Sequence, residues 1–223
     1  MPKRAKRAGA DALPGRPRSP AIDQAVLRAA FSLFIERGLA GTSIEKIAER
    51  AGVARTSIYR RWANRDAFLA EAIEAARNQF AARYTADVIR RAAPTDFAQL
   101  LLGVGELMAR PEVKTLVTRL IGTIPDNPRL VEVYRDTYFM PRRRALLEAL
   151  RRVQAAGALS DAVDVDVVAD MLAGALIYRL IFDLGTSDTS NDVPGYVLKL
   201  IRALGFDLTA LGLTAGDAAR GRL

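Results

Sequence analysis

The chain has 223 residues, of which 50% are apolar and 26% are charged, so it is long and apolar enough to bury a sizeable core. It contains no Cys and no His, which excludes disulfides, zinc fingers, haem ligation and Cys or His nucleophile–base pairs. The net charge of +8 lies entirely in residues 1–70, which hold 14 Lys and Arg against 6 Asp and Glu. This distribution is typical of a basic nucleic-acid-binding module attached to a neutral one.

The first 18 residues are predicted to form a basic flexible arm, with Pro and Gly among the cations Lys3, Arg4, Lys6, Arg7, Arg16 and Arg18. Such an arm either keeps the protein soluble or lies along DNA, and the sequence that follows favours DNA contact. No apolar run of a secretory signal follows it. The longest apolar stretch, 171–184, is too short to span a bilayer and is interrupted by Arg179 and Asp183. We therefore expect a cytoplasmic protein without a membrane partner.

Ser19 and Pro20 are typical of a helix start, and apolar residues recur at helical spacing from there until Gly38. Residues 41–62 then predict two short helices joined by a tight turn. Thr42 and Glu45 have the spacing of a capping box, and Gly52 stands where the first of the two helices must end. The second helix, from Ala54 or Arg55, is polar and basic. This is the pattern of a DNA-binding helix-turn-helix, with a plain helical hairpin as the alternative.

The rest of the chain shows only helical spacing, so the predicted fold class is all-α. Asn64 is predicted to cap a helix that begins at Arg65 or Asp66. Pro141 falls inside a long predicted helix and should kink or split it. Residues 207–223 are expected to be a fraying tail. The further predicted helices cover residues 94–109, 112–122, 128–157, 164–185 and 193–205.

The segment from Gly15 to Leu69 contains GRPR, TSIEKIA, AGV and SIYRRW, and it resembles the DNA-binding domain of the tetracycline-repressor (TetR/AcrR) family. The later helices are similar to that family in number, length and order only. The resemblance implies a helix-turn-helix DNA-binding domain over 19–64 and a helical ligand-binding and dimerisation domain over 65–206. It also implies a homodimer that binds a double-stranded DNA operator. The absence of His is a departure from members that sense a metal–drug complex, so a tetracycline-like inducer is not expected.

The family pattern places DNA contact on the starts of the two short helices and on the helix that follows them. Among the candidates, Arg55 and Arg60 are the best base readers, because a guanidinium can bond O6 and N7 of guanine together. Tyr59, Thr42 and Arg65 are expected to hold phosphates. The full set of predicted DNA contacts is Thr42, Ser43, Arg55, Thr56, Ser57, Tyr59, Arg60 and Arg65.

A ligand pocket is predicted near Pro141, where a kinked helix leaves room among apolar walls with few polar anchors. Most such side chains simply belong to a core, so this set is a hypothesis. The apolar and aromatic candidates are Leu102, Met108, Leu116, Leu120, Tyr134, Tyr138, Phe139, Met140, Met171, Leu172 and Tyr178, and the candidate anchors are Glu106, Arg119 and Arg179. The expected ligand is a small apolar or aromatic molecule whose identity the sequence does not give.

Three weaker patterns are interpreted structurally. Gly103 and Gly105 begin like a dinucleotide-binding motif but lack its third Gly and its strand, so they indicate close helix packing. The acids between Asp161 and Asp170 lack the spacing of a calcium loop and indicate a helix start, so no metal is predicted. Five arginines are assigned to a solvated helix face in preference to an anion site: Arg142, Arg143, Arg144, Arg151 and Arg152.

These patterns predict a ligand-responsive repressor without cofactor or catalysis. The alternatives are a transcriptional activator, a regulator that responds to a protein, and an enzyme that uses the helical cavity; the last lacks any nucleophile–base arrangement. The last two helices are expected to form the two-fold dimer interface. The residues proposed for that interface are Val168, Met171, Leu172, Ala175, Val197, Leu200, Ile201 and Leu204.

Overall fold

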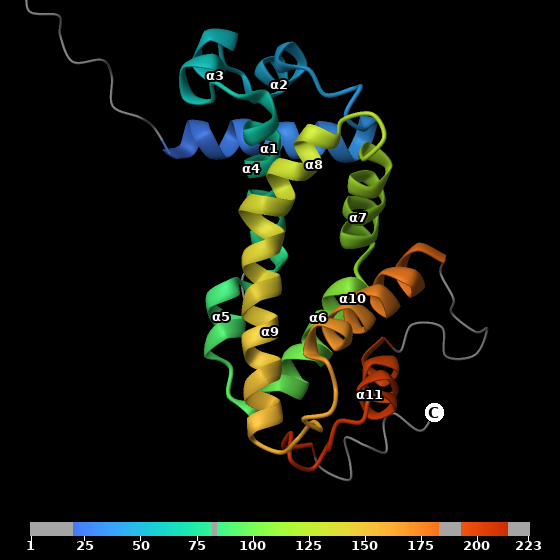
Figure 1. The fold of residues 1–223 in the computed structure, drawn as a ribbon. Helices are drawn as coiled ribbons and strands as arrows, with labels where there is room; N and C mark the ends of the chain where they lie inside the picture. Colours follow the sequence, from blue (N-terminus) through green and yellow to red (C-terminus); the bar gives the residue numbers. More distant parts are fainter. Residues whose placement is uncertain (1–19, 82–83, 183–192, 214–223) are drawn as a thin grey trace, which may run out of the picture.

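The computed structural model of the chain describes residues 20–81, 84–182 and 193–213, and every regular element within them is helical (Figure 1). The all-α class is therefore confirmed. Within these ranges no helix is long and apolar enough to cross a membrane. The elements are α1 (Pro20–Arg37), α2 (Ile44–Ala51), α3 (Arg55–Arg61), α4 (Arg65–Ala81), α5 (Ala86–Arg91), a 3₁₀ turn (Pro94–Asp96), α6 (Phe97–Met108), α7 (Pro111–Thr123), α8 (Pro128–Tyr134), a π-helical turn (Arg135–Phe139), α9 (Met140–Ala155), α10 (Val165–Phe182) and α11 (Val193–Ala203).

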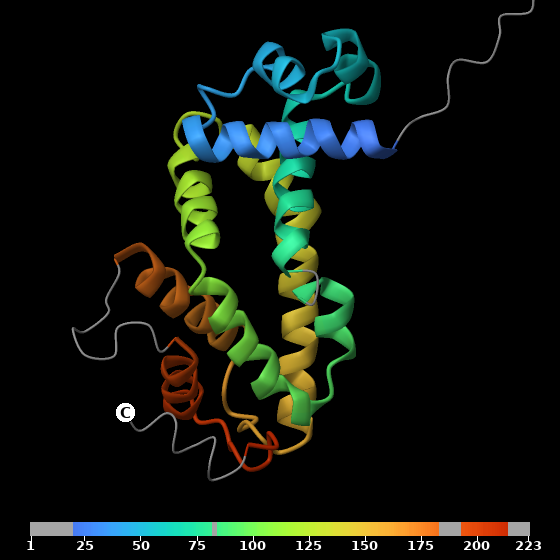
Figure 2. The same ribbon diagram turned by 180° about the vertical axis from the view of Figure 1, so that it is seen from behind.

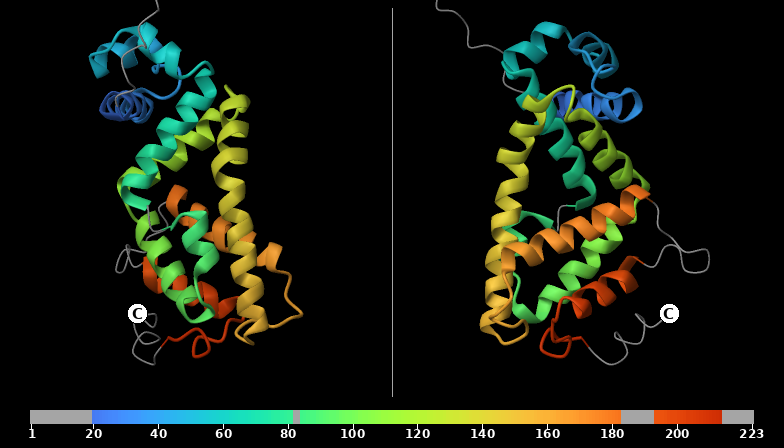
Figure 3. Two further views of the ribbon diagram at one scale, coloured as in Figure 1. Left: turned by 90° about the vertical axis from the view of Figure 1, so that its left-hand side faces the viewer. Right: turned by 45° about the vertical axis from the view of Figure 1, so that its right-hand side comes forward.

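The molecule has two parts, which we call the DNA-binding end, after the function predicted for it from the sequence, and the body. Helices α1, α2 and α3 form one end, and α1 lies crosswise over the helices below it (Figures 1 and 2). Helices α5, α6, α10 and α11 gather at the far end with the last turns of α9. Between the two ends, α7, α9 and α10 form the sides of a triangle, with α4 beside them (Figure 3).

The DNA-binding end has an apolar core of its own that also includes part of the body. This core is formed by apolar side chains from the four successive helices α1 to α4. Its almost fully buried members include Val26, Leu33, Ile47, Ile58 and Phe68. Leu130 of α8 is fully buried in the same cluster. The first helix of the body domain and α8 are thus packed directly onto the helix-turn-helix.

The start of α2 differs by one residue from the predicted capping box. Ser43, and not Thr42, is the N-cap, and its hydroxyl accepts a hydrogen bond from the Lys46 amide at 3.3 Å. The Thr42 hydroxyl is already used, because it donates to the Gly38 carbonyl at 2.8 Å. The end of α2 is as predicted: Gly52 has φ of 67°, the left-handed conformation that Gly adopts without strain.

Replacing Ser43 by Ala should therefore lower the free energy of unfolding by about 0.5–2 kcal/mol, the usual cost of losing an N-cap side chain. Chemical denaturation of the purified protein measures this value. Glu49→Ala, an exposed position on the same helix, is the matched control and should change it little. A loss no larger for Ser43→Ala than for Glu49→Ala would contradict the cap.

The long helix predicted from Pro128 is interrupted, as expected, just before Pro141. Helix α8 ends at Tyr134, five residues form a π-helical turn, and α9 continues from Met140. Proline has no amide proton to donate and cannot continue the regular ladder, so the local widening accommodates it. The Arg142 guanidinium caps the irregular turn by donating to the Tyr138 carbonyl at 2.8 Å.

The two glycines of α6 allow close packing, as predicted. A Cβ atom on Gly103 would overlap the hydroxyl of Tyr84, and one on Gly105 would lie 2.8 Å from Cγ2 of Val197 in α11. Neither contact leaves room for a larger side chain without movement.

Two parts of the body were not predicted correctly. The short helix α5, which packs on α9, was missed. Residues 207–213 do not fray: they form a turn capped by the Asp207 carboxylate, and Leu211 is completely buried in the body core. The predicted tail begins too early, because Leu208, Leu211 and Leu213 pack in or against the body core. The small residues between them in the sequence hid this apolar pattern. Residues 1–19 and 214–223, with the predicted arm, lie outside the described residues.

Candidate functional site

Helix α3 presents a polar face at the outer end of the molecule (Figure 1). Ile58 turns inward and is 1% exposed, whereas Arg55, Thr56 and Arg60 are exposed and the Tyr59 side chain is 58% exposed. Ser57 is half-buried on the flank. One apolar anchor in a short helix thus leaves a row of long polar side chains free to enter a groove, as a recognition helix requires.

The three arginines of α3 have different surroundings. Arg55 forms an ion pair with the exposed Glu45 of α2, with the two side chains 3.5 Å apart. Arg60 makes no ion pair with any of the described residues. Arg61 points inward, where it pairs with Asp23 of α1 and donates to the Ser57 carbonyl at 3.1 Å. Arg60 is therefore the guanidinium most free to bind a base, and Arg61 fixes α3 against α1.

A second contact fixes α3 against α4. Trp62 follows α3 and donates from its indole nitrogen to Glu71 at 2.8 Å, and its ring lies 4.8 Å from that of Phe68. Both partners lie on α4, so a rotation of α4 would carry the recognition helix with it.

The predicted phosphate contacts need one correction. Thr42 is 1% exposed and its hydroxyl is bonded to Gly38, so its side chain supports the turn and is not free to meet a phosphate. Ser43 is half-buried and serves as the N-cap. Arg65 is exposed, but one of its nitrogens donates to the Thr42 carbonyl at 3.1 Å. Contact with DNA by the remaining predicted residues stays a prediction.

The residues predicted to line a ligand pocket do not gather around one space. Leu116, Leu120 and Tyr134 pack with the core between α1, α4 and α7, whereas Leu172 lies in the separate core of the body. Arg119 does not act as an anchor in the body, because it donates to the Ile35 and Glu36 carbonyls at the end of α1. Met108 packs beside Leu107 and Leu180, Tyr138 packs on the DNA-binding core, and Met140 is half-buried. Met171 and Tyr178 are 50% and 56% exposed.

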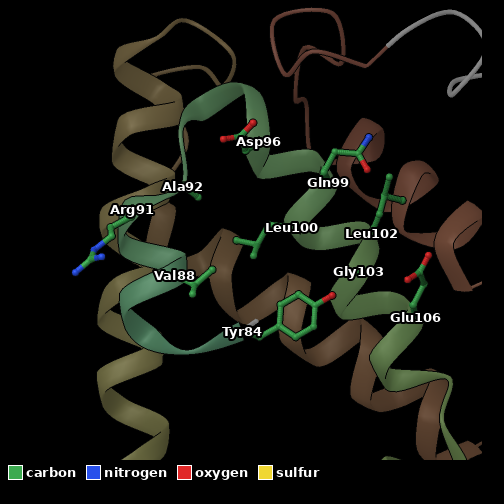
Figure 4. Close-up of a pocket in the computed structure, with 10 residues that line it drawn as sticks. All are labelled: Tyr84, Val88, Arg91, Ala92, Asp96, Gln99, Leu100, Leu102, Gly103 and Glu106. Carbon is green, nitrogen blue, oxygen red and sulfur yellow. The ribbon is translucent and has the colours of Figure 1, made fainter. Parts of the chain in front are cut away.

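A pocket of about 590 Å³ lies between α5 and α6 (Figure 4). Leu102 and Glu106 are the two predicted ligand residues that line it. The other lining residues are Tyr84, Val88, Arg91, Ala92, Asp96, Gln99, Leu100 and Gly103. Part of this wall was missed because Val88 and Arg91 belong to α5, a helix too short to give a clear periodic signal.

A buried cluster of charged side chains lies between α4 and α9. Glu74 is 7% exposed, and one of its oxygens accepts from Arg142 while Arg77 lies 3.8 Å from the same oxygen. We call Glu74, Arg77 and Arg142 the Glu74 cluster. Tyr134 and Tyr138 adjoin it, with ring centres 5.7 Å apart. Burial, followed by the field of Glu74, raises the pKa of Tyr134, so this phenol stays neutral at physiological pH.

The assignment of the five arginines to a solvated face is therefore only partly right. Arg144 and Arg151 are exposed. Arg142 is half-buried in the Glu74 cluster, and Arg143 pairs with Asp166 and Asp170 at 2.9 and 2.8 Å. The acids near the start of α10 thus face an arginine, and Asp164 also accepts from the Asp166 amide at 2.8 Å, as a helix start requires.

The outer face of α10 is apolar and uncovered within the described part of the chain. Large apolar side chains on this face are 50–62% exposed. Their spacing of three or four residues places them along one side of the helix. We call this the α10 stripe, and it comprises Val167, Met171, Gly174, Tyr178 and Phe182.

Four of the eight predicted dimer residues are buried within a single protomer and are therefore not available to a partner. Val168, Leu172, Val197 and Ile201 are 0–3% exposed within a single protomer. They belong to the core of the body. Of the residues proposed for the interface, Met171 is the one that is exposed as part of the α10 stripe.

Comparison with known proteins gives matches to both halves of the chain. Residues 26–72 match the tetR family of bacterial regulatory proteins, and residues 93–191 match the tetracyclin repressor-like C-terminal domain. The uncharacterized HTH-type transcriptional regulator YdeS of Bacillus subtilis is 31% identical over 192 residues, which cover 84% of this chain and 89% of the relative.

Solved structures share the fold. The transcriptional regulator FadR from Bacillus subtilis, in complex with stearoyl-CoA, matches with a TM-score of 0.62 and 19% identity over 85% of this chain and 98% of that one. A transcriptional regulator from Saccharomonospora viridis in complex with choline matches with a TM-score of 0.61 and 19% identity, over 81% and 95% of the two chains. At these identities the likeness bears on the fold alone.

Proposed function

Because the chain belongs to the tetR family of bacterial regulatory proteins, and is therefore a DNA-binding transcriptional regulator, we propose that it is a ligand-responsive repressor that binds a near-palindromic operator as a homodimer. The observation that carries the proposal is the exposed polar face of α3, with Arg55, Thr56, Tyr59 and Arg60 on the outer end of the molecule. Side chains of these types read base edges and bind phosphates.

A mobility-shift experiment with the DNA upstream of the protein's own gene tests this function. We expect a shifted band that an excess of unlabelled scrambled duplex reduces only weakly. Specific base contacts, added to the salt-dependent phosphate contacts, make the operator complex the tighter one. Deletion of the gene should raise transcription from the bound promoter. A fall in transcription would support an activator instead, and the absence of any shift would argue against local regulation.

The α10 stripe supports the proposed homodimer. A contiguous apolar surface of this kind is unusual on a monomer. Packing against the same surface of a second copy would cover it, and a two-fold interface is the commonest solution for soluble oligomers. Such a dimer would present two α3 helices to successive major grooves, which accounts for a near-palindromic operator.

Ligand responsiveness is supported by the way the body is joined to the DNA-binding end. Helix α4 is the covalent connection, but it does not act alone. Asn127, beside α8, donates to Asp66 of α4 at 3.2 Å, and Arg119 of α7 holds the last carbonyls of α1. A ligand that changes the packing of α7, α8 or α9 can therefore move α1 and α4 together. In this proposal the body of residues 65–206 binds the ligand and forms the dimer.

Ligand binding and operator binding should weaken each other by the same factor. The ligand acts only by binding one conformation of the body better than another, and linkage makes the effect reciprocal. We expect a coupling of about 1–3 kcal/mol, or roughly 5- to 150-fold. Calorimetric titration of a compound that binds the protein, with and without saturating operator, measures it. Equal ligand affinity in both titrations would show that the compound is not an inducer.

A further inference from the structure

The Glu74 cluster carries more positive than negative charge in a buried place. Its two guanidinium groups face one carboxylate, and the neighbouring Tyr134 and Tyr138 do not supply a second anion because burial raises both of their pKa values. Burial and the repulsion from Arg142 lower the pKa of Arg77. One positive charge is thus left without an anionic partner in the cluster, which is costly away from water.

The same side chains have unused hydrogen-bonding atoms. Arg142 donates from its two terminal nitrogens to the Tyr138 carbonyl and to Glu74, while its Nε is buried without a partner among the described residues. Oε2 of Glu74 also has no hydrogen-bond partner among the described residues, and neither has Nη1 of Arg77, whose ion-pair contact with Oε1 of Glu74 is 3.8 Å long. Two of the three open atoms are guanidinium donors. Water could satisfy the donors, but only an anion would satisfy the charge as well.

The surroundings of the cluster are apolar and aromatic. Tyr134 packs with Phe34, Ile73 and Leu116, which are 1–3% exposed. Arg77 also donates to the Tyr84 carbonyl at 3.4 Å, and the ring of Tyr84 lines the pocket between α5 and α6 (Figure 4). The charged group of a ligand would therefore meet two arginines, while the rest of it would meet hydrocarbon.

We propose that the Glu74 cluster binds the charged group of the effector, and that the effector is an organic anion, with a carboxylate as its simplest form, on an apolar or aromatic body. This proposal rests on the proposed ligand response and names the class of ligand. The carboxylate of the effector takes the place of Glu74 on Arg142. Because Glu74 lies on α4 and Arg142 on α9, this exchange releases the tie between the helix that leads to the DNA-binding end and the long helix of the body.

The test compares carboxylates with their neutral amides on the full-length protein. The probes are phenylacetate, 4-phenylbutyrate and octanoate, each titrated calorimetrically beside the corresponding amide. Charge-assisted hydrogen bonds to a buried arginine predict that at least one acid binds about tenfold or more tightly than its amide. If no acid binds, or if amides bind as well as acids, the proposal is overturned. This comparison needs no substitution and so does not depend on a variant that folds.

Substitutions then test whether the acid binds at the cluster, because the arginine variants and the Glu74 variant should change its affinity in opposite directions. Arg77→Gln and Arg142→Gln should each weaken the acid about tenfold, the loss of one charge-assisted bond. Glu74→Gln should tighten it, because it removes both a negative charge and the competitor for Arg142. The matched control is Arg135→Gln, which removes an exposed arginine of the π-helical turn and should change nothing. If Glu74→Gln weakens binding as the arginine variants do, the cluster is only structural and the proposal fails.

Operator binding without any compound is measured on every protein, both to verify folding and to separate this proposal from the proposed function. If an acid binds the cluster without releasing operator DNA, the cluster is an anion site but has no regulatory role. If none of the three acids binds but a neutral compound releases operator DNA, the anion site is overturned. The proposal of a ligand-responsive repressor would still hold.

Discussion

Replacing both Met171 and Tyr178 by Glu should give monomers that bind the operator about 10²- to 10⁴-fold more weakly than the native protein. Both side chains are half-exposed members of the α10 stripe, so they are not needed for the core of a single protomer. Four carboxylates brought to a two-fold interface would be buried without partners, which opposes association. The loss of DNA affinity follows because two linked half-site contacts are replaced by one.

Sedimentation and operator titration measure the two effects on one preparation. The matched control is the double substitution of Ile121, in α7, and Ile124, its C-cap residue, by Glu, since these residues are 41% and 48% exposed but lie off the stripe. It should leave the protein dimeric. An intact dimer in the Met171 and Tyr178 double variant would place the interface elsewhere.

The sequence alone could not identify this face. Helix α10 is apolar around most of its circumference, so Leu172 and Met171 look equivalent in the sequence. In the folded chain, Leu172 is 3% exposed and Met171 is 50% exposed. Which of two apolar faces meets the protein's own core is decided by the neighbouring helices, and the sequence pattern of one helix does not contain that information.

The DNA-binding end was predictable to within a residue because its signals are local. Gly52 must adopt a positive φ, and Asn64 caps α4 by accepting from the Asp66 and Ala67 amides. The error at the start of α2 is instructive, since Thr42 and Ser43 are both good N-caps. A contact outside the helix decides between them: the Thr42 hydroxyl donates to the Gly38 carbonyl, so Ser43 is the residue that caps α2.

The Glu74 cluster was missed for the opposite reason. Glu74, Arg77 and Arg142 have the residue types of a solvated helix face, and their burial depends on the meeting of α4 with a helix 68 positions later in the chain. Under our proposal, the aromatic residues on which the sequence prediction relied do not mark the ligand site. Charged side chains that the fold removes from water are more informative, and only a structure shows them.

Arg60→Ala should weaken operator binding by about 1–3 kcal/mol per half-site, and by roughly 2–6 kcal/mol in a dimer that loses the contact twice. Arg60 is exposed on α3 and makes no ion pair among the described residues, so its guanidinium is free to hold a guanine through O6 and N7. Preference at one base pair in each half-site should relax. Competition titrations with operators that differ at single positions measure both effects.

Two further variants separate base reading from charge. Arg60→Lys keeps the positive charge but not the two-pronged donor geometry, so it should lose discrimination at that base pair while the dependence of affinity on salt stays nearly unchanged. Arg65→Ala should instead weaken the operator and scrambled DNA alike, because Arg65 is expected to hold a phosphate and also holds the Thr42 carbonyl at the start of α2. If Arg60→Ala reduces binding to scrambled DNA as much as binding to the operator, Arg60 contacts the backbone, and base recognition falls to Arg55 once it leaves Glu45.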